Sequence, residues 1–408
     1  MLTSPLFRWS TAAALACCLG TFEAQAQQPD QPETAKQQQS QKPEAAKKNQ
    51  SAKKQPAKRK PKAMFPAITV PAEGGTDYAL QGEYVGTYTD DGIEEEKVGY
   101  QVVALSDGKF RIVGYRGGLP GDGYNGEPIL SAEGEMNQEG KVLFTHEEGA
   151  AVLDEDGISI HPPGGGVAVG HAKSVLRRSP TLGKEPPKGA VVLFNGKSAN
   201  KFVDGQMTEE NCLKVGTQTK RTFGDFELHL EFKTPFMPTA TGQRRGNSGV
   251  YLQGRYEVQV LDSFGCEGLD NECGGIYKQA TPKVNMCFPP LTWQTYDITF
   301  TAAKFDKDGK KTDNARVNVL HNGVLIHDDV ELTTGTQGGP LKEESTELGP
   351  IYFQSHTEDP VVYNNIWIVD KSKQKKNNKQ ASMKKKQQQS QDQQKPNKKN
   401  KKDKPAQG

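Results

Sequence analysis

The chain has 408 residues and a net charge of only +2 at neutral pH, but this charge is segregated along the sequence. Residues 27–63 carry +7 and residues 371–408 carry +12, which leaves −17 on residues 64–370. We therefore expect an acidic folded body, long enough for two domains, between two basic segments. Beyond the N-terminal segment, no run approaches the ~20 apolar residues of a membrane span, which excludes a membrane-spanning protein.

The first 26 residues have the pattern of an export signal. Arg8 supplies the positive charge, a short apolar run follows it, and Ala24 and Ala26 stand at the small-x-small positions of a cleavage site. The apolar run is too short to cross a bilayer. A lipoprotein signal through Cys17 is the alternative. We expect an exported protein, periplasmic or extracellular, that is cleaved after Ala26.

Two basic segments flank the part of the chain that can fold. Residues 27–63 are rich in Gln, Lys and Pro, and residues 371–408 are rich in Lys and Gln, with almost no apolar side chains in either. Such segments cannot bury enough surface to fold, so we predict disordered tethers. Their charge also suits an anionic polymer outside the cell as a partner. No aromatic residues are interleaved with the lysines, which argues against specific binding of nucleic acid.

Residues 64–178 are predicted to form a small antiparallel β domain. Short alternating runs lie between Gly-centred turn signals, which is typical of hairpin-connected strands. The runs are "GYQVVAL", "KFRIVGY", "KVLFTH" and "GISIHP", and the turns are Asp107-Gly108, Glu139-Gly140 and Asp156-Gly157. This region shows no pattern of catalytic side chains.

Residues 179–188 are predicted to be a linker, and a second β region follows at residues 189–370. Its runs include "VVLFNGKS", "FGDFELHLEF", "WQTYDITF" and "ARVNVLHNGVLIHDD", in which Asn322-Gly323 is a strong hairpin signal. No helical periodicity of useful length interrupts them. A region of this length built from antiparallel strands predicts an all-β, two-sheet sandwich of jelly-roll type.

One strand of the second region has a polar face. In "RYEVQV", the two-residue period of a strand places Tyr256, Val258 and Val260 on one face and Glu257 and Gln259 on the other. The apolar face should enter the core. The polar face is either plain solvent-facing surface or a binding surface.

The residues around this strand leave several alternatives open. Gln253 would join the polar face if Gly254-Arg255 makes a tight turn. Asp262 would point away from Glu257 by strict alternation, unless a bulge turns it. Glu257 could instead form a surface ion pair with Arg255.

Four cysteines remain after cleavage of the signal: Cys212, Cys266, Cys273 and Cys287. In an oxidising compartment at least one disulfide is expected, and four cysteines allow three complete connectivities. Zinc is disfavoured, because the spacing C-x6-C-x13-C is too loose and no histidine lies nearby. A divalent cation has no supporting motif either, since "FDKDGK" begins like a calcium loop but lacks its later ligands. We identify no cofactor.

Eight short motifs in residues 189–370, taken in order, resemble those of a known protein family. They are "LFNGKS", "FGDFELHLEF", "RGNSGVYLQGRYEVQVLDS", "ECGGIYKQATPKVNMCFPP", "WQTYDITF", "HNGVLIHDD", "GPIYFQSH" and "NNIWI". Their order and spacing resemble the 3-keto-disaccharide hydrolase family over about residues 189–370. The resemblance implies a concanavalin-like β-sandwich. It also implies a sugar substrate: a glycoside whose glucose unit is oxidised to a ketone at C3, cleaved by hydrolysis or by elimination across C1–C2.

The resemblance and the strand pattern together suggest roles for individual residues. A C3 ketone acidifies the C2 proton, so we expect Glu257 as the catalytic acid/base and His356 as its proton partner. Candidates for substrate contact are Gln253, Gln259, Asp262, Tyr277, Asn285, Gln354 and Trp367. Of these, Tyr277 or Trp367 would form an apolar platform for the sugar. Because Cys273 and Cys287 lie in the resembling motifs and bracket one loop, the resemblance also implies that they pair.

Other interpretations of these residues are structural. Trp367 suits the core better than a sugar platform, Asn285 is equally suited to capping a turn, and His356 could instead make a hydrogen bond at a strand end. The chain also departs from the family pattern: where the family has two arginines before "NIWI", this chain has Val362 and Asn364. Contacts made by those arginines are therefore not expected. A catalytically silent sugar-binding module on the same sandwich is the main alternative function, followed by an interaction protein held by its basic segments.

Overall fold

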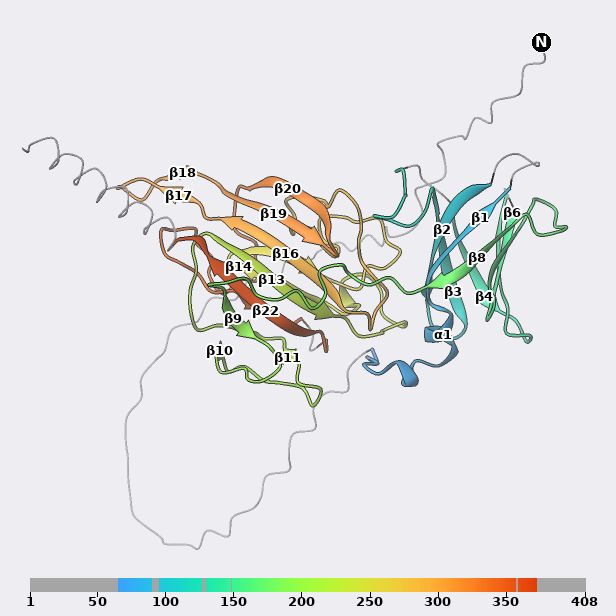
Figure 1. Ribbon diagram of the computed structural model, residues 1–408, viewed down its shortest axis with the longest axis horizontal. Helices are drawn as coiled ribbons and strands as arrows, with labels where there is room; N and C mark the ends of the chain where they lie inside the picture. The colour runs from blue at the N-terminus through green and yellow to red at the C-terminus, as the bar shows by residue number, and fades with distance from the viewer. Residues whose placement is uncertain (1–64, 90–94, 127–129, 148, 357–358, 373–408) are drawn as a thin grey trace, which may run out of the picture. The chain divides into compact units, whose positions relative to one another are not determined.

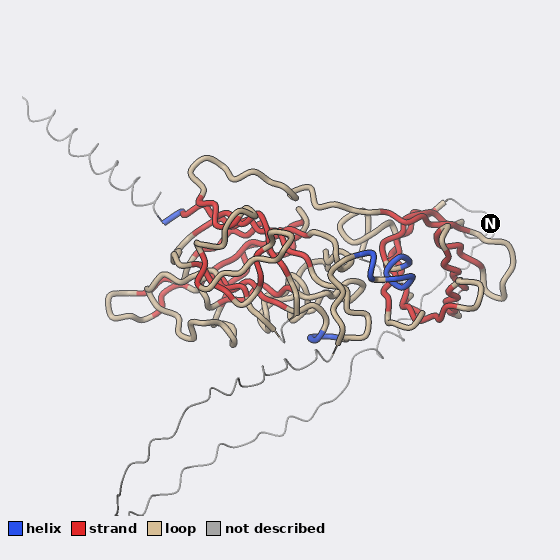
Figure 2. The backbone as a smooth tube through the Cα atoms, turned by 90° about the horizontal axis from the view of Figure 1, so that it is seen from below, coloured by secondary structure: helices blue, strands red, loops and turns tan. Residues whose placement is uncertain are grey.

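The computed structural model describes residues 65–89, 95–126, 130–147, 149–356 and 359–372. The predicted export signal, the segment 27–63 and nearly all of the C-terminal segment lie outside these ranges. Strands and loops make up almost all of the described chain, and its helices are short (Figures 1 and 2). None of the helices within these ranges combines the length and the apolar character that a membrane span requires.

The first described element group is a closed barrel of eight antiparallel strands (Figure 1, blue to green). Two short helical segments, η1 (Pro71–Glu73) and α1 (Gly75–Leu80), precede it. Its strands are β1 (Gly82–Tyr88), β2 (Glu96–Ala104), β3 (Lys109–Arg116), β4 (Ser131–Met136), β5 (Val142–His146), β6 (Gly149–Asp154), β7 (Gly157–His161) and β8 (Gly170–Val175). Each strand pairs with the next, and β8 closes the barrel against β1. The four runs expected from the sequence are β2, β3, β5 and β7.

Side chains from alternate positions fill the barrel, as the two-residue period requires. Phe110, Ile112, Phe144 and Leu153 are fully buried in one cluster with Tyr84. At about 1.5–3 kcal/mol for each large apolar side chain buried, this cluster is the main source of stability for the barrel.

Two sheets form the sandwich that follows. The five-stranded sheet has the order β10 (Phe202–Val203), β12 (Thr217–Thr219), β21 (Tyr352–Phe353), β14 (Ser248–Leu252) and β15 (Tyr256–Val260). The seven-stranded sheet has the order β11 (Leu213–Lys214), β22 (Val362–Asp370), β13 (Phe226–Lys233), β16 (Gln294–Thr301), β19 (Ala315–His321) and β20 (Val324–Leu332), and β9 (Val191–Phe194) also pairs with β22. A short helix η2 (Gly242–Arg244) and the hairpin of β17 (Lys304–Phe305) and β18 (Lys311–Asp313) complete it.

The core lies between the inner faces of the two sheets. The five-stranded sheet contributes Val250, Leu252, Tyr256, Val258, Val260 and Phe353, and the seven-stranded sheet contributes Leu228, Leu230, Phe232, Ile298, Phe300, Val317 and Ile368. The all-β sandwich expected from the sequence is confirmed.

Turn residues have the conformations that their types favour. Asn322 and Gly323 join β19 to β20 with positive φ at both positions, 49° and 80°. This is the backbone that a two-residue hairpin turn requires and that Asn and Gly adopt most readily. The "FDKDGK" run is the tip of the β17–β18 hairpin, where Asp306 Oδ1 accepts hydrogen bonds from the backbone N–H groups of Asp308 and Lys310.

The predicted disulfide between Cys273 and Cys287 is absent, because both residues are thiols. The two side chains do lie together, within hydrogen-bonding reach of one another in the core. Each sulfur also has another partner: Cys273 Sγ lies 3.3 Å from Tyr296 Oη, and Cys287 Sγ donates to the Leu261 carbonyl at 3.5 Å. The sequence motifs thus identified the neighbours correctly, whereas the predicted bond between them was wrong.

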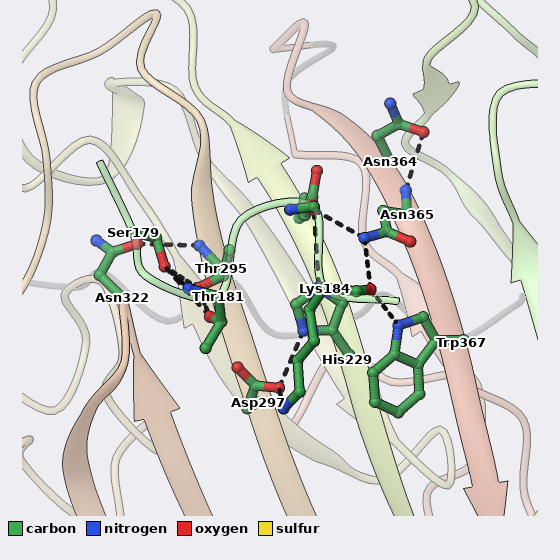
Figure 3. Close-up of polar contacts among 12 residues, drawn as sticks. Ser179, Thr181, Lys184, His229, Thr295, Asp297, Asn322, Asn364, Asn365 and Trp367 are labelled. Carbon is green, nitrogen blue, oxygen red and sulfur yellow. Dashed lines mark hydrogen bonds and ion pairs between the residues drawn. The ribbon is translucent and has the colours of Figure 1, made fainter. Parts of the chain in front are cut away.

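The segment predicted to be a linker is bound to the outer face of the seven-stranded sheet (Figure 3). Ser179 Oγ and Thr181 Oγ1 both lie within hydrogen-bonding distance of Thr295 Oγ1, at 2.6 and 2.7 Å. Lys184 Nζ forms an ion pair with Asp297 at 2.8 Å. Residues 179–184 therefore form a strap across β16.

Under the strap lies a buried histidine with a carboxylate on each side. His229 Nδ1 is 3.0 Å from Asp297 Oδ1, and His229 Nε2 is 3.7 Å from Glu231 Oε1. The Trp367 ring stacks on the imidazole with 5.2 Å between centroids. Burial alone would lower the pKa of His229, but its hydrogen bond to Asp297 and the nearby Glu231 carboxylate raise that pKa above its ordinary value. The favoured state is an imidazolium shared by two anions.

Replacing His229 should therefore destabilise the sandwich in a pH-dependent way. A raised pKa in the folded state contributes stability that is present below the unfolded value near 6.5 and is lost as pH rises through the folded value. We expect His229→Gln to lower the free energy of unfolding by about 1.5–3 kcal/mol at pH 6, with the difference shrinking by pH 9.

Urea unfolding followed by tryptophan fluorescence measures this effect, because Trp293 and Trp367 both belong to the sandwich. The exposed His171 of the barrel offers the control His171→Gln, which should leave the transition unchanged. A His229→Gln deficit that is equal at pH 6 and pH 9 would contradict the proposed imidazolium.

Candidate functional site

The alternation expected along β15 is present in the structure. Tyr256, Val258 and Val260 are buried in the core between the sheets. Glu257 and Gln259 lie on the opposite face of the five-stranded sheet, and both are almost fully buried, with exposures of 3% and 2%. This polar face is therefore not plain solvent-facing surface, and the buried carboxyl group on it requires a chemical explanation.

Tyr251 on β14 is the direct partner of Glu257. The β14–β15 register places the two residues opposite each other, and the Tyr251 Oη–H group donates to Glu257 Oε2 at 2.9 Å. Gly249, the next residue along this face, leaves room for the carboxyl group, because a Cβ there would lie 2.0 Å from Glu257 Oε1. In the "NSGVY" sequence, Gly249 thus leaves space for the Glu257 carboxyl group and Tyr251 donates a hydrogen bond to it.

Loops cover the outer edge of β15. The backbone N–H of Glu257 donates to Thr336 Oγ1 at 3.2 Å, and its carbonyl accepts from the Tyr277 N–H at 3.3 Å. Farther along, Gln259 exchanges backbone hydrogen bonds with Gly274 and Gly275. These contacts protect the edge strand and enclose the Glu257 carboxyl group.

Burial changes the acidity of this pair. Desolvation raises the pKa of Glu257 to about 7, although the hydrogen bond from Tyr251 opposes the shift. Burial and the neighbouring carboxylate raise the pKa of Tyr251 well above its ordinary value. A carboxyl group with a pKa near neutrality can both accept and return a proton at neutral pH, which is the property of a general acid/base.

Side-chain amides lie beside Glu257 on the same face. Asn247 Nδ2 donates to the carbonyl and side-chain oxygens of Gln243, at 2.8 and 3.1 Å. Gln259 Nε2 donates to the same Gln243 Oε1 at 3.3 Å. These bonds orient the Asn247 amide, whose Oδ1 is buried and has no hydrogen-bond partner. A buried acceptor without a donor is costly for the protein and suits a ligand hydroxyl group.

The structure brings some of the predicted site residues together. Gln354 Nε2 donates to Tyr251 Oη at 3.3 Å, and the Tyr277 ring is close enough to raise the pKa of Tyr251. Gln259 belongs to the amide cluster. These three, with Glu257, form one site.

Two other predicted site residues, Gln253 and His356, have different surroundings in the structure. Gln253 has a positive φ of 53°, so its side chain turns away from the polar face and donates to the Phe223 carbonyl at 2.9 Å. The proposed proton partner His356 follows β21 by three residues, and its carbonyl accepts from the Asp359 N–H. The side chain that donates a hydrogen bond to Glu257 is Tyr251.

Three further candidates have structural partners instead of a place beside Glu257. Asp262 lies beyond the end of β15 and is buried in an ion pair with Arg245, at 2.6 Å. Asn285 donates to the carbonyls of Ser263 and Cys266, both at 2.9 Å, and so holds a loop. Trp367 lies on the outer face of the other sheet, beneath the strap. The structure therefore does not bring these three together with Glu257, and their contact with substrate stays a prediction.

Three other positions discussed from the sequence do not contact Glu257 either. Arg255 does not pair with Glu257; its guanidinium donates to the Glu343 carbonyl at 2.7 Å and to Ser345 Oγ at 3.1 Å. Val362 and Asn364, which replace the family arginines, lie on β22 in the seven-stranded sheet, opposite Lys233 and Glu231. The replacements therefore do not fall within the Glu257–Tyr251 pair.

Sequence reasoning missed Tyr251 and Gln243, whereas Asn247 was left as equally suited to a turn cap or a ligand contact. The signal for Tyr251 was available: if residues 253–255 form the turn, the hairpin register places position 251 opposite position 257. Asn247 follows from the same two-residue period. Gln243 has no comparable signal, because it reaches the face from the helix η2.

Comparison with known proteins identifies the sandwich. Residues 189–369 match the family described as 3-keto-alpha-glucoside-1,2-lyase-like domain, and no curated protein matches the chain. Three solved structures of candidate glycosyl hydrolases from Parabacteroides distasonis ATCC 8503 are similar to it. The first is 35% identical, covering 45% of this chain and 84% of that one, with a TM-score of 0.41.

The other two are 20% and 21% identical, cover 48% and 44% of this chain and 98% of their own, and have TM-scores of 0.33 and 0.32. The family match agrees with the motifs found in the sequence. Through residues 189–369, the chain belongs to the carbohydrate-active family of 3-keto-alpha-glucoside-1,2-lyase-like domains.

Proposed function

We propose that this protein is an exported enzyme that cleaves glycosides of 3-keto-glucose, with Glu257 as its general acid/base. The observation that carries the proposal is the Glu257 carboxyl group itself: it is buried on the sheet face, has a pKa of about 7 and is held by the Tyr251 hydroxyl. An ordinary surface carboxylate is neither buried nor has a pKa near neutrality, so it is ionised at neutral pH and is a poor general acid. Family membership supports the choice of substrate.

The proposed chemistry is an elimination across C1–C2. Ionised Glu257 removes the proton from C2, which the C3 ketone has acidified, and the electron pair of that C–H bond forms the enolate. The enolate then expels the oxygen substituent from C1 to form the C1–C2 double bond. The proton collected by Glu257 is the one that the leaving oxygen needs, so the turnover is balanced without any other reactant. Addition of water to the product at C1 would complete a net hydrolysis.

The neutral amides beside Glu257 would bind the sugar. Asn247 Oδ1 is a buried acceptor without a hydrogen-bond donor, and a sugar hydroxyl group could donate to it. If the predicted export signal acts, the reaction would take place outside the cytoplasm, and the basic end segments would retain the enzyme near an anionic polymer.

Our first test concerns the substrate. The purified mature protein should cleave a 3-keto-glucoside and leave the unoxidised parent glucoside intact, because only the ketone makes the C2 proton removable by a carboxylate. Product analysis by mass spectrometry after parallel incubations measures this. Equal cleavage of both compounds would indicate an ordinary glycosidase, and binding without cleavage would indicate a silent sugar-binding module.

Replacing the acid/base should remove turnover and leave the fold intact. Glu257→Gln is nearly isosteric and deletes only the ionisable group, so we expect kcat to fall by about 100- to 10,000-fold with little change in melting temperature. The matched control is Glu227→Gln on β13, whose carboxylate pairs with Lys371; its activity should equal that of the wild type. Full activity in Glu257→Gln would exclude this residue as the base.

The pH dependence offers an independent check. Because Glu257 must be ionised to take the C2 proton, kcat/KM should rise with pH through a midpoint of about 7. Initial rates on the 3-keto-glucoside between pH 5 and 9 measure the midpoint. A midpoint near 4.5, the ordinary value for glutamate, would mean that the working carboxyl group is exposed and is not Glu257.

A further inference from the structure

The Tyr251 hydroxyl has one proton and two acceptors. Tyr251 Oη lies 2.9 Å from Glu257 Oε2 and also 2.9 Å from the carbonyl oxygen of Gln337. A phenolic O–H group can donate to only one of them at a time. Which of the two receives it depends on whether Glu257 carries a proton.

Gln337 belongs to a glycine-rich surface loop, residues 333–341, that lies between β20 and β21. Its sequence is "TTGTQGGPL", and Gln337 and Gly338 are exposed. The loop packs directly on Tyr251: a Cβ at Gly338 would lie 2.9 Å from Tyr251 Oη, and a Cβ at Gly339 would lie 2.8 Å from the Tyr251 ring. Glycines at these positions allow the loop to cover the tyrosine.

The loop is held to the β14–β15 hairpin at only a few points. The Thr336 N–H donates to the Arg255 carbonyl at 2.6 Å, and the Leu341 N–H donates to the Gly254 carbonyl at 3.1 Å. The bond from Tyr251 to Gln337 lies between these anchors. Gln279 also bonds to Thr333 and Thr334, and Thr336 Oγ1 accepts from the Glu257 N–H. The Tyr251–Gln337 bond therefore adds to these anchors at the exposed centre of the loop.

The two protonation states of Glu257 differ in how well they satisfy Gln337. Ionised Glu257 accepts the hydrogen bond from Tyr251 Oη–H. This charge-assisted bond is stronger than a bond from Tyr251 to the Gln337 carbonyl, so that carbonyl is left without its donor. Protonated Glu257 instead donates its own O–H to Tyr251 Oη, and Tyr251 then donates to Gln337. All three groups are satisfied only when Glu257 is protonated.

We propose that Tyr251 couples the protonation of Glu257 to closure of the 333–341 loop, so that the loop opens over ionised Glu257 and closes once Glu257 has taken a proton. This inference rests on the proposed function, in which Glu257 takes its proton from the sugar. Substrate then enters while the base is ionised, and proton removal from C2 closes the loop over the reacting ring. Closure keeps water away while the leaving group departs.

Several titratable side chains face the Tyr251–Glu257 pair and its site. They are Tyr277 from the edge loop, Tyr352 from β21 and Tyr363 from the opposite sheet, together with Asp359, whose Oδ2 accepts from the Asn247 N–H at 2.8 Å. The pKa of Glu257 is set by burial and by Tyr251, and the Arg255 guanidinium is turned toward Glu343 and Ser345.

Hydrogen–deuterium exchange of the loop, without any substrate, tests the coupling. The amides of Thr333, Thr336 and Leu341 are hydrogen-bonded and should exchange only when the loop opens. If Glu257 titrates at about 7 under the closed loop and at its ordinary 4.5 when the loop is open, opening is about tenfold more favourable at pH 8 than at pH 6. After correction for intrinsic rates, exchange should therefore be about tenfold faster at pH 8.

Three variants separate the coupling from a general loosening of the fold. Glu257→Gln carries an amide that donates to Tyr251 at every pH, so its loop should stay protected at both pH values. Tyr251→Phe removes the donor to the Gln337 carbonyl, so its loop should exchange faster than that of the wild type at pH 6, where the wild-type loop is best protected. Tyr352→Phe removes a neighbouring hydroxyl from the same face and should behave like the wild type.

A pH-independent rate in the wild type, or a Glu257→Gln loop that opens with pH as the wild type does, would overturn the proposal. Because exchange needs no turnover, this result is distinct from failure of the proposed function. If the protein shows the coupling but cleaves no 3-keto-glucoside, the proposed loop coupling stands and the proposed substrate is wrong.

Discussion

The Glu257 carboxyl group is held out of water on a β-sheet face, with the Tyr251 hydroxyl as its partner, and the rest of the site is arranged around that placement. Gly249 leaves space for the carboxyl group, Gln354 and Tyr277 surround the tyrosine, and the glycine-rich loop covers them. Burying a lone carboxyl group is unfavourable for folding, so this arrangement is expected where a proton must be exchanged near neutral pH.

Local pattern alone was enough to predict part of this arrangement. The alternation in "RYEVQV" separates Val258 and Val260 from Glu257 and Gln259, because the period of a strand is a property of its own backbone. The Asn322-Gly323 turn is local in the same sense. The order of short motifs was equally informative about the family and about the all-β sandwich.

Contacts made across long stretches of sequence could not be predicted in this way. Gln337 reaches Tyr251 from a loop that is 86 residues farther along the chain, and no periodicity connects the two. Trp367 is a candidate for the sugar site from the sequence, but its strand belongs to the other sheet. Alternation within a strand does not indicate which sheet that strand joins. Cys273 and Cys287 were correctly placed together, yet proximity in a motif does not distinguish two thiols from a disulfide.

The most direct test of this account is a measurement of the Glu257 pKa in the folded protein without ligand. Carbon-13 NMR of side-chain carboxyl groups in protein labelled at glutamate Cδ, compared with Glu257→Gln to assign the signal, provides it. We expect a single carboxyl signal that titrates near pH 7 and is missing from the variant. A Glu257 signal that titrates near its ordinary value of 4.5 would contradict the central claim, because the carboxyl group would then be neither desolvated nor poised to act as an acid/base.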